Sequence, residues 1–244
     1  MGLLSRAVLA HRGWRYRTRV DPDEIRWMRS VLRPGDLVVD VGAYKGGYTY
    51  WMRREVGEAG LVLAFEPQPT LAGYLCERVR DFGWQNVHVH ETALSSEPGT
   101  RRLYRPGAES TPAASLVGAS LPEGAEGYDV SVATLDAVLE RVAPGRPVRL
   151  IKCDVEGHEL DVFVGASAAI EAHRPHLLFE CEERHLEERG MRDVFAYLER
   201  LGYAGSFFWR GERRPVGEHR AERHQVEGQR PYVNNFVFVH PATS

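Results

Sequence analysis

The sequence predicts an α/β protein in which a parallel sheet carries helices on both faces, the doubly wound arrangement. Short apolar runs of strand type alternate along the chain with longer stretches of helical periodicity. The first run, VVDV at 38–41, enters a glycine-rich turn that leads into a helical stretch, as in nucleotide-binding folds. With 244 residues and 43% apolar content, the chain is expected to form a single domain over 1–244.

Strands and helices are predicted in a regular order. The expected strands are 37–41, 61–65, 87–90, 128–132, 148–153, 176–180, 205–209 and 232–239. The expected helices are 22–32, 48–54, 70–82, 135–142 and 160–172. The first of these helices takes Asp21 as its N-cap and closes a basic, helical N-terminal extension of about residues 1–34. Residues 105–127 are rich in Gly, Pro, Ala and Ser, and predict a long loop or lid.

The composition limits which binding partners and which cellular location are expected. A net charge of −3 argues against general nucleic-acid binding, and the arginines near 6–19 and 210–230 are expected on solvated faces. Three cysteines without metal-type spacing predict neither disulfides nor zinc, and indicate a reducing cytoplasm. No apolar run reaches the ~20 residues of a membrane span, and the start does not resemble a signal peptide. We therefore expect a small-molecule partner, no nucleic acid and no membrane; a homo-oligomer stays open.

The glycine turn at 42–47 indicates which nucleotide the chain binds. A dinucleotide fingerprint needs a middle glycine for the pyrophosphate, and Tyr44 occupies that position. Glu66, 26 residues after Asp40, stands where a carboxylate commonly accepts ribose hydroxyls. A nucleoside with an amino-acid tail and no phosphates, such as S-adenosylmethionine, fits this pattern, although a glycine between strand and helix also occurs in other α/β proteins.

A second motif, RLIKCDVEGHE at 149–159, places Asp154 at the end of a buried strand, with Glu156 and His158 in the following turn. These three are the candidate catalytic residues: Asp154 as an orienting group, and Glu156 or His158 as the base. The alternative is structural, with His158 capping the next helix and Glu159 on its solvated face.

Six ordered segments resemble the FkbM family of S-adenosylmethionine-dependent methyltransferases, over about residues 21–240. They are VVDVGAYKGG (38–47), FEPQ (65–68), NVHVHETALSSEPG (86–99), VATLD (132–136), IKCDVEGHE (151–159) and NNFVFV (234–239).

The resemblance implies a Rossmann-like class I methyltransferase fold, a seven-stranded, mostly parallel sheet with a C-terminal antiparallel hairpin. It also implies which residues bind the cofactor. The implied set runs from the methionine portion through the ribose to the adenine and comprises Asp40, Gly42, Ala43, Tyr44, Gly46, Glu66, Pro67, Glu91, Thr92, Ala93 and Asp154. Tyr44 departs from the family, which usually has Asn there.

Two further sites are weighed around the second motif. Asp154, Glu180 and Glu182 could bind Mg²⁺, but the run ECEERHLEERG is also typical of an acidic helix, so a metal is not favoured. For the acceptor, the candidates are Ser115, at the pocket entrance, with Glu180, Arg213 and Arg214. The two arginines follow a strand expected to run parallel to the central ones, which would bring them to the catalytic side; a solvated hairpin tip is the alternative.

The leading hypothesis is a methyltransferase that methylates a hydroxyl of a small molecule, in specialised metabolite or glycan synthesis. An NAD-dependent oxidoreductase is disfavoured by Tyr44 and by the lack of a Tyr-x-x-x-Lys pair. A nucleic-acid methyltransferase is disfavoured by the charge balance and by the lack of an Asn-Pro-Pro-Tyr-like motif. A non-catalytic cofactor-binding or scaffold module is the remaining alternative.

Overall fold

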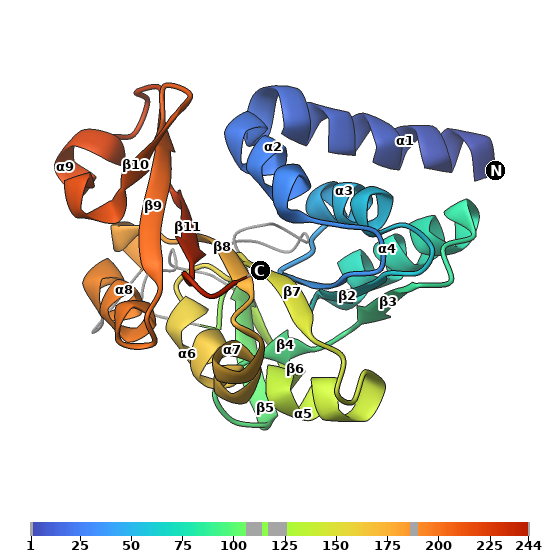
Figure 1. Cartoon of the computed structure of the whole chain (residues 1–244). Helices are drawn as coiled ribbons and strands as arrows, with labels where there is room; N and C mark the ends of the chain where they lie inside the picture. The colour runs from blue at the N-terminus through green and yellow to red at the C-terminus, as the bar shows by residue number, and fades with distance from the viewer. Residues whose placement is uncertain (1, 106–113, 117–125, 186–189, 244) are drawn as a thin grey trace.

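The computed structural model describes residues 2–105, 114–116, 126–185 and 190–243. It has a large mixed sheet with helices on both faces and a small second sheet (Figure 1). The helices are α1 (Gly2–Arg15), α2 (Pro22–Val31), α3 (Gly47–Val56), α4 (Pro69–Phe82), α5 (Leu135–Val142), α6 (Glu159–Val164), α7 (Ser167–His173), α8 (Met191–Arg200) and α9 (Ala221–His224). The strands are β1 (Leu37–Val41), β2 (Leu61–Phe65), β3 (Val87–His90), β4 (Ala93–Leu94), β5 (Gly99–Arg105), β6 (Glu126–Ala133), β7 (Val148–Cys153), β8 (His176–Glu180), β9 (Ala204–Trp209), β10 (Glu212–Pro215) and β11 (Asn235–Val239).

The large sheet has the strand order β10-β9-β11-β8-β7-β1-β2-β3. Strands β3, β2, β1, β7 and β8 pair in parallel, and β11 is antiparallel to both β8 and β9. The predicted α/β class, the parallel centre and the antiparallel C-terminal strands are therefore confirmed. The sheet has eight strands instead of the seven expected.

The additional strand is β10, at the edge of the sheet. Arg210 and Gly211 both have positive φ, 56° and 82°, which is the backbone of a two-residue hairpin turn. The chain therefore folds back along β9 immediately, where a basic loop was expected. A hairpin of polar residues at a sheet edge has no buried face, so it lacks the apolar alternation that would predict it.

Two other predictions need correction. The single helix expected over 160–172 is two helices, α6 and α7, which meet at Gly165. A Cβ at Gly165 would lie 2.0 Å from the Ser95 carbonyl oxygen, so the backbones approach each other closely at this break. The second sheet has the order β4-β6-β5, and only its middle strand, β6, was predicted. Strand β5 (GTRRLYR) is largely polar and so lacks the apolar pattern of a strand.

Each face of the large sheet has its own core. One consists of Leu37, Val39 and Val41 of β1 packed against α5–α8; the other brings Val38 together with α1–α4. A strand buried on both faces carries apolar residues at nearly every position, as LVVDV does. Asp40 is the exception, and it points toward the α1–α4 side with 0% exposure.

The N-terminal extension packs on the α3 and α4 side of the sheet (Figure 1). Leu9 of α1 is fully buried there. Asp21 precedes α2 but makes no capping bond, and instead accepts a hydrogen bond from the Tyr48 hydroxyl at 3.0 Å. Most of the predicted lid, residues 106–113 and 117–125, lies outside the described residues. No helix within the described residues has both the length and the apolar character needed to cross a bilayer.

Candidate active site

A cavity opens at the carboxyl edge of the sheet, where ligands bind in open α/β folds. It encloses about 790 Å³, including space open to solvent. Its walls come from the ends of the central strands, from α3, from the N-terminal segment and from the second sheet. Among its lining residues are the predicted Asp40, Gly42, Ala43, Tyr44, Glu66, Pro67, Thr92, Ala93, Asp154 and His158.

The glycine turn after β1 brings two strand ends together. Gly42 has φ +71°, and a Cβ there would lie 1.9 Å from the carbonyl oxygen of Asp154. Any side chain would therefore push the end of β1 away from the end of β7. Gly46 has φ +80°, but its Cβ position faces Leu75 and Leu9. Gly46 thus allows α4 and α1 to pack closely, and it does not line the cavity.

Glu66, at the end of β2, is held by the backbone around it. One carboxylate oxygen accepts a hydrogen bond from Tyr44 N at 2.8 Å, and the other accepts one from Gln68 N at 3.0 Å. Burial raises the pKa of Glu66 to about 7, and the two N–H donors oppose that shift. The Gln68 side chain adds a third hydrogen bond, so the carboxylate, which offers about four lone-pair sites, keeps one with which to accept a bond from a ligand.

Lys152, which sequence analysis did not single out, lies at the centre of the site. Its Nζ is 3.3 Å from Oδ2 of Asp154 and 3.7 Å from Oδ1 of Asp40. Burial alone would lower the pKa of Lys152, but the two carboxylates outweigh burial and raise it. Asp40 Oδ2 also accepts a hydrogen bond from Thr49 Oγ1 at 2.5 Å. This network ties β1, β7 and α3 together below the cavity floor.

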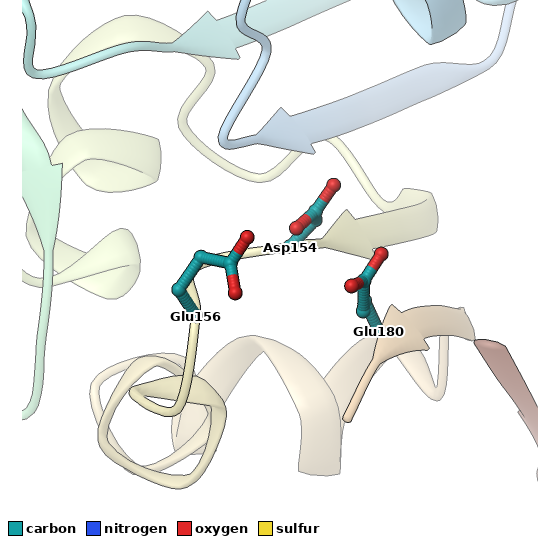
Figure 2. Close-up of side chains that lie close together, drawn as sticks. All are labelled: Asp154, Glu156 and Glu180. Atoms are coloured by element: carbon teal, nitrogen blue, oxygen red, sulfur yellow. The ribbon is translucent and has the colours of Figure 1, made fainter. Parts of the chain in front are cut away.

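Three carboxylates meet beside the cavity at Asp154 (Figure 2). Asp154, Glu156 and Glu180 can each bring one carboxylate oxygen within 4.8 Å of the others. Glu156 has φ 53°, a conformation that is uncommon for a residue with a side chain. Burial, followed by the charges of Asp154 and Glu156, raises the pKa of Glu180 well above its usual value. Three oxygen donors at such distances could hold a hard cation.

Glu182, the third member of the predicted metal set, makes a hydrogen bond with Glu180 and is held by other side chains as well. It accepts hydrogen bonds from the Tyr232 hydroxyl at 2.6 Å and from Arg184 Nε at 2.5 Å. Burial would raise the pKa of Glu182, but these bonds outweigh it and lower the pKa. Glu156 therefore takes the place in the carboxylate group that the sequence analysis gave to Glu182.

The His158 side chain is buried against the neighbouring sheet. Its Nε2 lies 2.9 Å from Ser95 Oγ, and its Nδ1 lies 3.7 Å from Asp161 Oδ2. It makes no side-chain cap to α6. Glu159, expected on a solvated face, is only 1% exposed, and burial raises its pKa to about 7. The structural alternative is therefore wrong for Glu159, whereas His158 does occupy the N-cap position of α6, although its side chain makes no capping bond.

The remaining predicted residues lie outside the cavity lining. Glu91 is exposed on the loop after β3. Ser115 donates a hydrogen bond to the Glu156 carbonyl at 2.6 Å, while its neighbours Ala114 and Leu116 line the cavity. Strand β9 does run parallel to the central strands, but β10 carries Arg213 and Arg214 back along it, four strands from β7 in the sheet order. Arg213 donates a hydrogen bond to Ser206 Oγ at 2.6 Å.

Several lining residues escaped the sequence analysis, namely Lys152, Tyr16, Gly47, Tyr48, Gln68 and Leu103. For Lys152 a signal was present: a lysine inside the buried run RLIKC has no route to solvent and requires a buried counter-charge. Tyr16 and Leu103 carry no local signal, because only the tertiary fold brings them to the cavity.

The model of the methyltransferase FkbM domain family matches residues 40–204, about two thirds of the chain. The chain belongs to the FkbM methyltransferase family. Its fold agrees with this membership. A crystal structure of a methyltransferase FkbM from Methylobacillus flagellatus superposes with a TM-score of 0.54 and 16% identity, covering 88% of this chain and 50% of the other. A putative rRNA methylase from Clostridium thermocellum gives 0.50 and 12%, covering 88% and 93%.

Curated relatives match this FkbM protein over shorter stretches. Ribosomal RNA large subunit methyltransferase E of Halorhodospira halophila is 39% identical over 91 residues, which is 35% of this chain and 42% of that protein. The Xanthomonas oryzae protein of the same name is 36% identical over 63 residues, 25% of this chain and 30% of its own length. The chain thus spans less than half the length of these relatives.

Proposed function

We propose that this FkbM protein transfers a methyl group from S-adenosylmethionine to a hydroxyl of a small molecule in the cytoplasm. The observation that carries the proposal is the cavity itself, which has Glu66 at one wall and Asp154, with Glu156 and Glu180 beside it, at another. The first wall suits a ribose. The second suits an acceptor that must lose a proton.

The donor half of the cavity fits a nucleoside without phosphates. Glu66 retains a lone pair for a ribose hydroxyl, while the backbone and the Gln68 side chain fix its orientation. Thr92, Ala93 and Leu103 supply a mainly apolar wall on the β3 side, suited to adenine. Among the described lining residues the only lysine or arginine is Lys152, which is already paired, so a pyrophosphate would meet Glu66 and Asp154 without a free cation from that lining. This disfavours an NAD-dependent oxidoreductase.

The acceptor half supports proton removal by a carboxylate. Bound S-adenosylmethionine supplies an electrophilic methyl group on a sulfonium. Asp154, fixed by Lys152, would orient the acceptor hydroxyl, and Glu156 would take its proton while the sulfur–methyl bond is exchanged for an oxygen–methyl bond and the thioether leaves. Burial raises the pKa of Glu180 and so favours its protonated form, which can donate a hydrogen bond. His158 is the less suitable base because its ring binds Ser95 and faces Asp161.

The ribosomal RNA enzymes among the relatives raise a second class of acceptor, but the site favours a small molecule. The group formed by Asp154, Glu156 and Glu180 supplies no cation to neutralise phosphates, and that neutralisation dominates nucleic-acid binding.

Calorimetry and a methylation assay test the proposal. We expect S-adenosylhomocysteine to bind with a Kd of about micromolar and NADH not to bind. Intact-mass analysis should detect an added methyl group on a polyol, phenol or glycoside acceptor. Ribosomal RNA treated in the same way should gain fewer methyl groups. Glu156→Gln should slow transfer without changing S-adenosylhomocysteine affinity, whereas Glu140→Gln, an exposed change on α5, should alter neither. If S-adenosylhomocysteine does not bind, the proposal is wrong. If it binds but no acceptor is methylated, the non-catalytic scaffold alternative is favoured.

A further inference from the structure

Tyr16 reaches the cavity from a segment that precedes the family match, which begins at residue 40. It opens a π-helical turn, Tyr16–Val20, between α1 and α2, closed by a hydrogen bond from Asp21 N to Tyr16 O at 2.9 Å. Such turns are rare and are found frequently at functional sites. The segment thus lies outside the stretch matched by the family model and supplies part of a wall.

Contacts on both sides fix the Tyr16 ring. A Cβ at Gly47, the first residue of α3, would lie 2.7 Å from two ring carbons, so the ring packs flat against this glycine. The ring of Tyr48 meets it edge-on, with centroids 5.6 Å apart. On the N-terminal side of Tyr16, the Gly13 carbonyl accepts a hydrogen bond from Trp51 Nε1 at 2.7 Å. On its C-terminal side, Asp21 accepts one from the Tyr48 hydroxyl. The ring therefore has a defined position without using its hydroxyl.

The Tyr16 hydroxyl is left available. None of the described residues forms a hydrogen bond with it. Burial raises the pKa of Tyr16 to about 12; Lys152 opposes that shift, and Asp154 and Asp21 add to it. The group consequently stays protonated and can donate a hydrogen bond at neutral pH.

The sheet order places Tyr16 at a particular end of the cavity. Along the carboxyl edge the strands follow the order β7-β1-β2-β3, so Lys152 and Asp154 lie on one side of Gly42, and Glu66 and Thr92 lie on the other. Lys152 Nζ lies 5.2 Å from the centre of the Tyr48 ring, which in turn meets the Tyr16 ring edge-on, so Tyr16 belongs to the β7 side. A ligand with its ribose at Glu66 and its base toward Thr92 directs its remaining part at Tyr16.

We propose that Tyr16 binds the amino-acid tail of S-adenosylmethionine, with its hydroxyl donating a hydrogen bond to the tail carboxylate. This inference rests on the proposed function. It assigns to the N-terminal extension a direct part in holding the methyl donor.

Two probes that differ only in the tail test this contact. S-adenosylhomocysteine carries the amino-acid tail, and 5′-methylthioadenosine keeps the adenine, ribose and thioether without it. In calorimetry, Tyr16→Phe should weaken S-adenosylhomocysteine binding by about tenfold and leave 5′-methylthioadenosine binding unchanged. Tyr74→Phe, on α4 and outside the cavity lining, is the matched control and should change neither.

The outcomes separate this inference from the proposed function. If Tyr16→Phe weakens both probes equally, or neither, the tail contact is overturned while donor binding stands. If the unaltered protein binds neither probe, the proposed function itself fails. Thermal unfolding without ligand checks that Tyr16→Phe keeps the fold, which we expect because the lost hydroxyl has no partner among the described residues.

Discussion

Lys152 and Asp40 lie side by side in the register of β7 and β1, with Nζ of Lys152 3.7 Å from Oδ1 of Asp40. Both side chains are almost fully buried, Lys152 at 4% and Asp40 at 0% exposure. Two opposite charges in such a place are tolerable only together, because each compensates the desolvation of the other. The pair therefore joins the two strands that form the floor of the cavity.

Lys152→Met should accordingly destabilise the protein strongly. Removing one member leaves Asp40 as an uncompensated buried charge, at a cost of about 3 to 5 kcal/mol in unfolding free energy. Urea unfolding measures the loss. The double variant Asp40→Asn/Lys152→Met should recover part of it, since no unpaired charge remains at position 40. A double variant no more stable than the single one would show that the pair does not carry this energy.

Gly42→Ala should be far more damaging than another glycine change with the same backbone conformation. Gly42 and Gly83 have φ of +71° and +68°, but only Gly42 faces a backbone atom, Asp154 O, at 1.9 Å. Gly83→Ala should cost about 1 kcal/mol, the left-handed strain alone. For Gly42→Ala we expect more than about 3 kcal/mol, because a backbone contact cannot move aside cheaply. Equal losses in thermal unfolding would contradict the close approach of β1 and β7.

Glu159→Gln should stabilise the protein at alkaline pH and not at acid pH. Burial raises the pKa of Glu159 to about 7, above the value of about 4.3 expected in the unfolded chain. A raised carboxyl pKa stabilises the folded state below the unfolded value, and this stability is lost as the pH rises through about 7.

Replacement by Gln removes that dependence, so the variant should gain about 1 to 3 kcal/mol over the natural chain at pH 8. The gain should vanish near pH 4.5. Glu140→Gln, on the exposed side of α5, is the control and should show no such slope. Urea unfolding at the two pH values measures the difference in unfolding free energy between the variant and the natural chain. A gain in stability that is independent of pH would exclude titration of Glu159 as its cause.

The sequence predicted the centre of the fold better than its edges, for a physical reason. Strands β1, β2, β7 and β8 have the expected bounds because burial on both faces demands continuous apolar runs. Strands β5 and β10 are polar and are strands only because their backbones pair with neighbouring strands. Their sequences therefore have no apolar periodicity from which a strand could be predicted. The same holds for the break at Gly165, which depends on a contact with the distant Ser95.

The residues of the site also fall into those that the sequence predicts and those that it does not. Gly42 and Glu66 were predictable because the turn geometry and the strand end are local properties of the chain. The ion pair of Lys152 needed the register of two strands more than a hundred positions apart, and Tyr16 needed the packing of the N-terminal segment on Gly47. The run RLIKC does indicate that Lys152 needs a buried partner, but it does not say which residue that partner is, and no local feature of the sequence indicates the place of Tyr16.

Glu66→Ala should weaken binding of S-adenosylhomocysteine by about 1 to 3 kcal/mol, because a ribose hydroxyl loses its acceptor. The affinity of the natural chain should also rise as the pH increases through about 7, the pKa to which burial raises Glu66, since the ionised carboxylate accepts this bond better. Calorimetry at pH 6 and 8 measures both effects. Glu66→Gln should lose the pH dependence; if it keeps the slope, another group is responsible.

Removal of divalent cations should leave methyl transfer nearly intact. The carboxylate group of Asp154, Glu156 and Glu180 resembles a metal site, but Lys152 at 3.3 Å already compensates Asp154. Burial raises the pKa of Glu180 and so disfavours its charged form, which weakens the attraction of this group for Mg²⁺. After dialysis against EDTA the transfer rate should therefore change by less than about twofold, and added Mg²⁺ should not raise it. A tenfold loss that Mg²⁺ restores, and that Glu180→Gln abolishes, would instead establish these three residues as ligands of a catalytic cation.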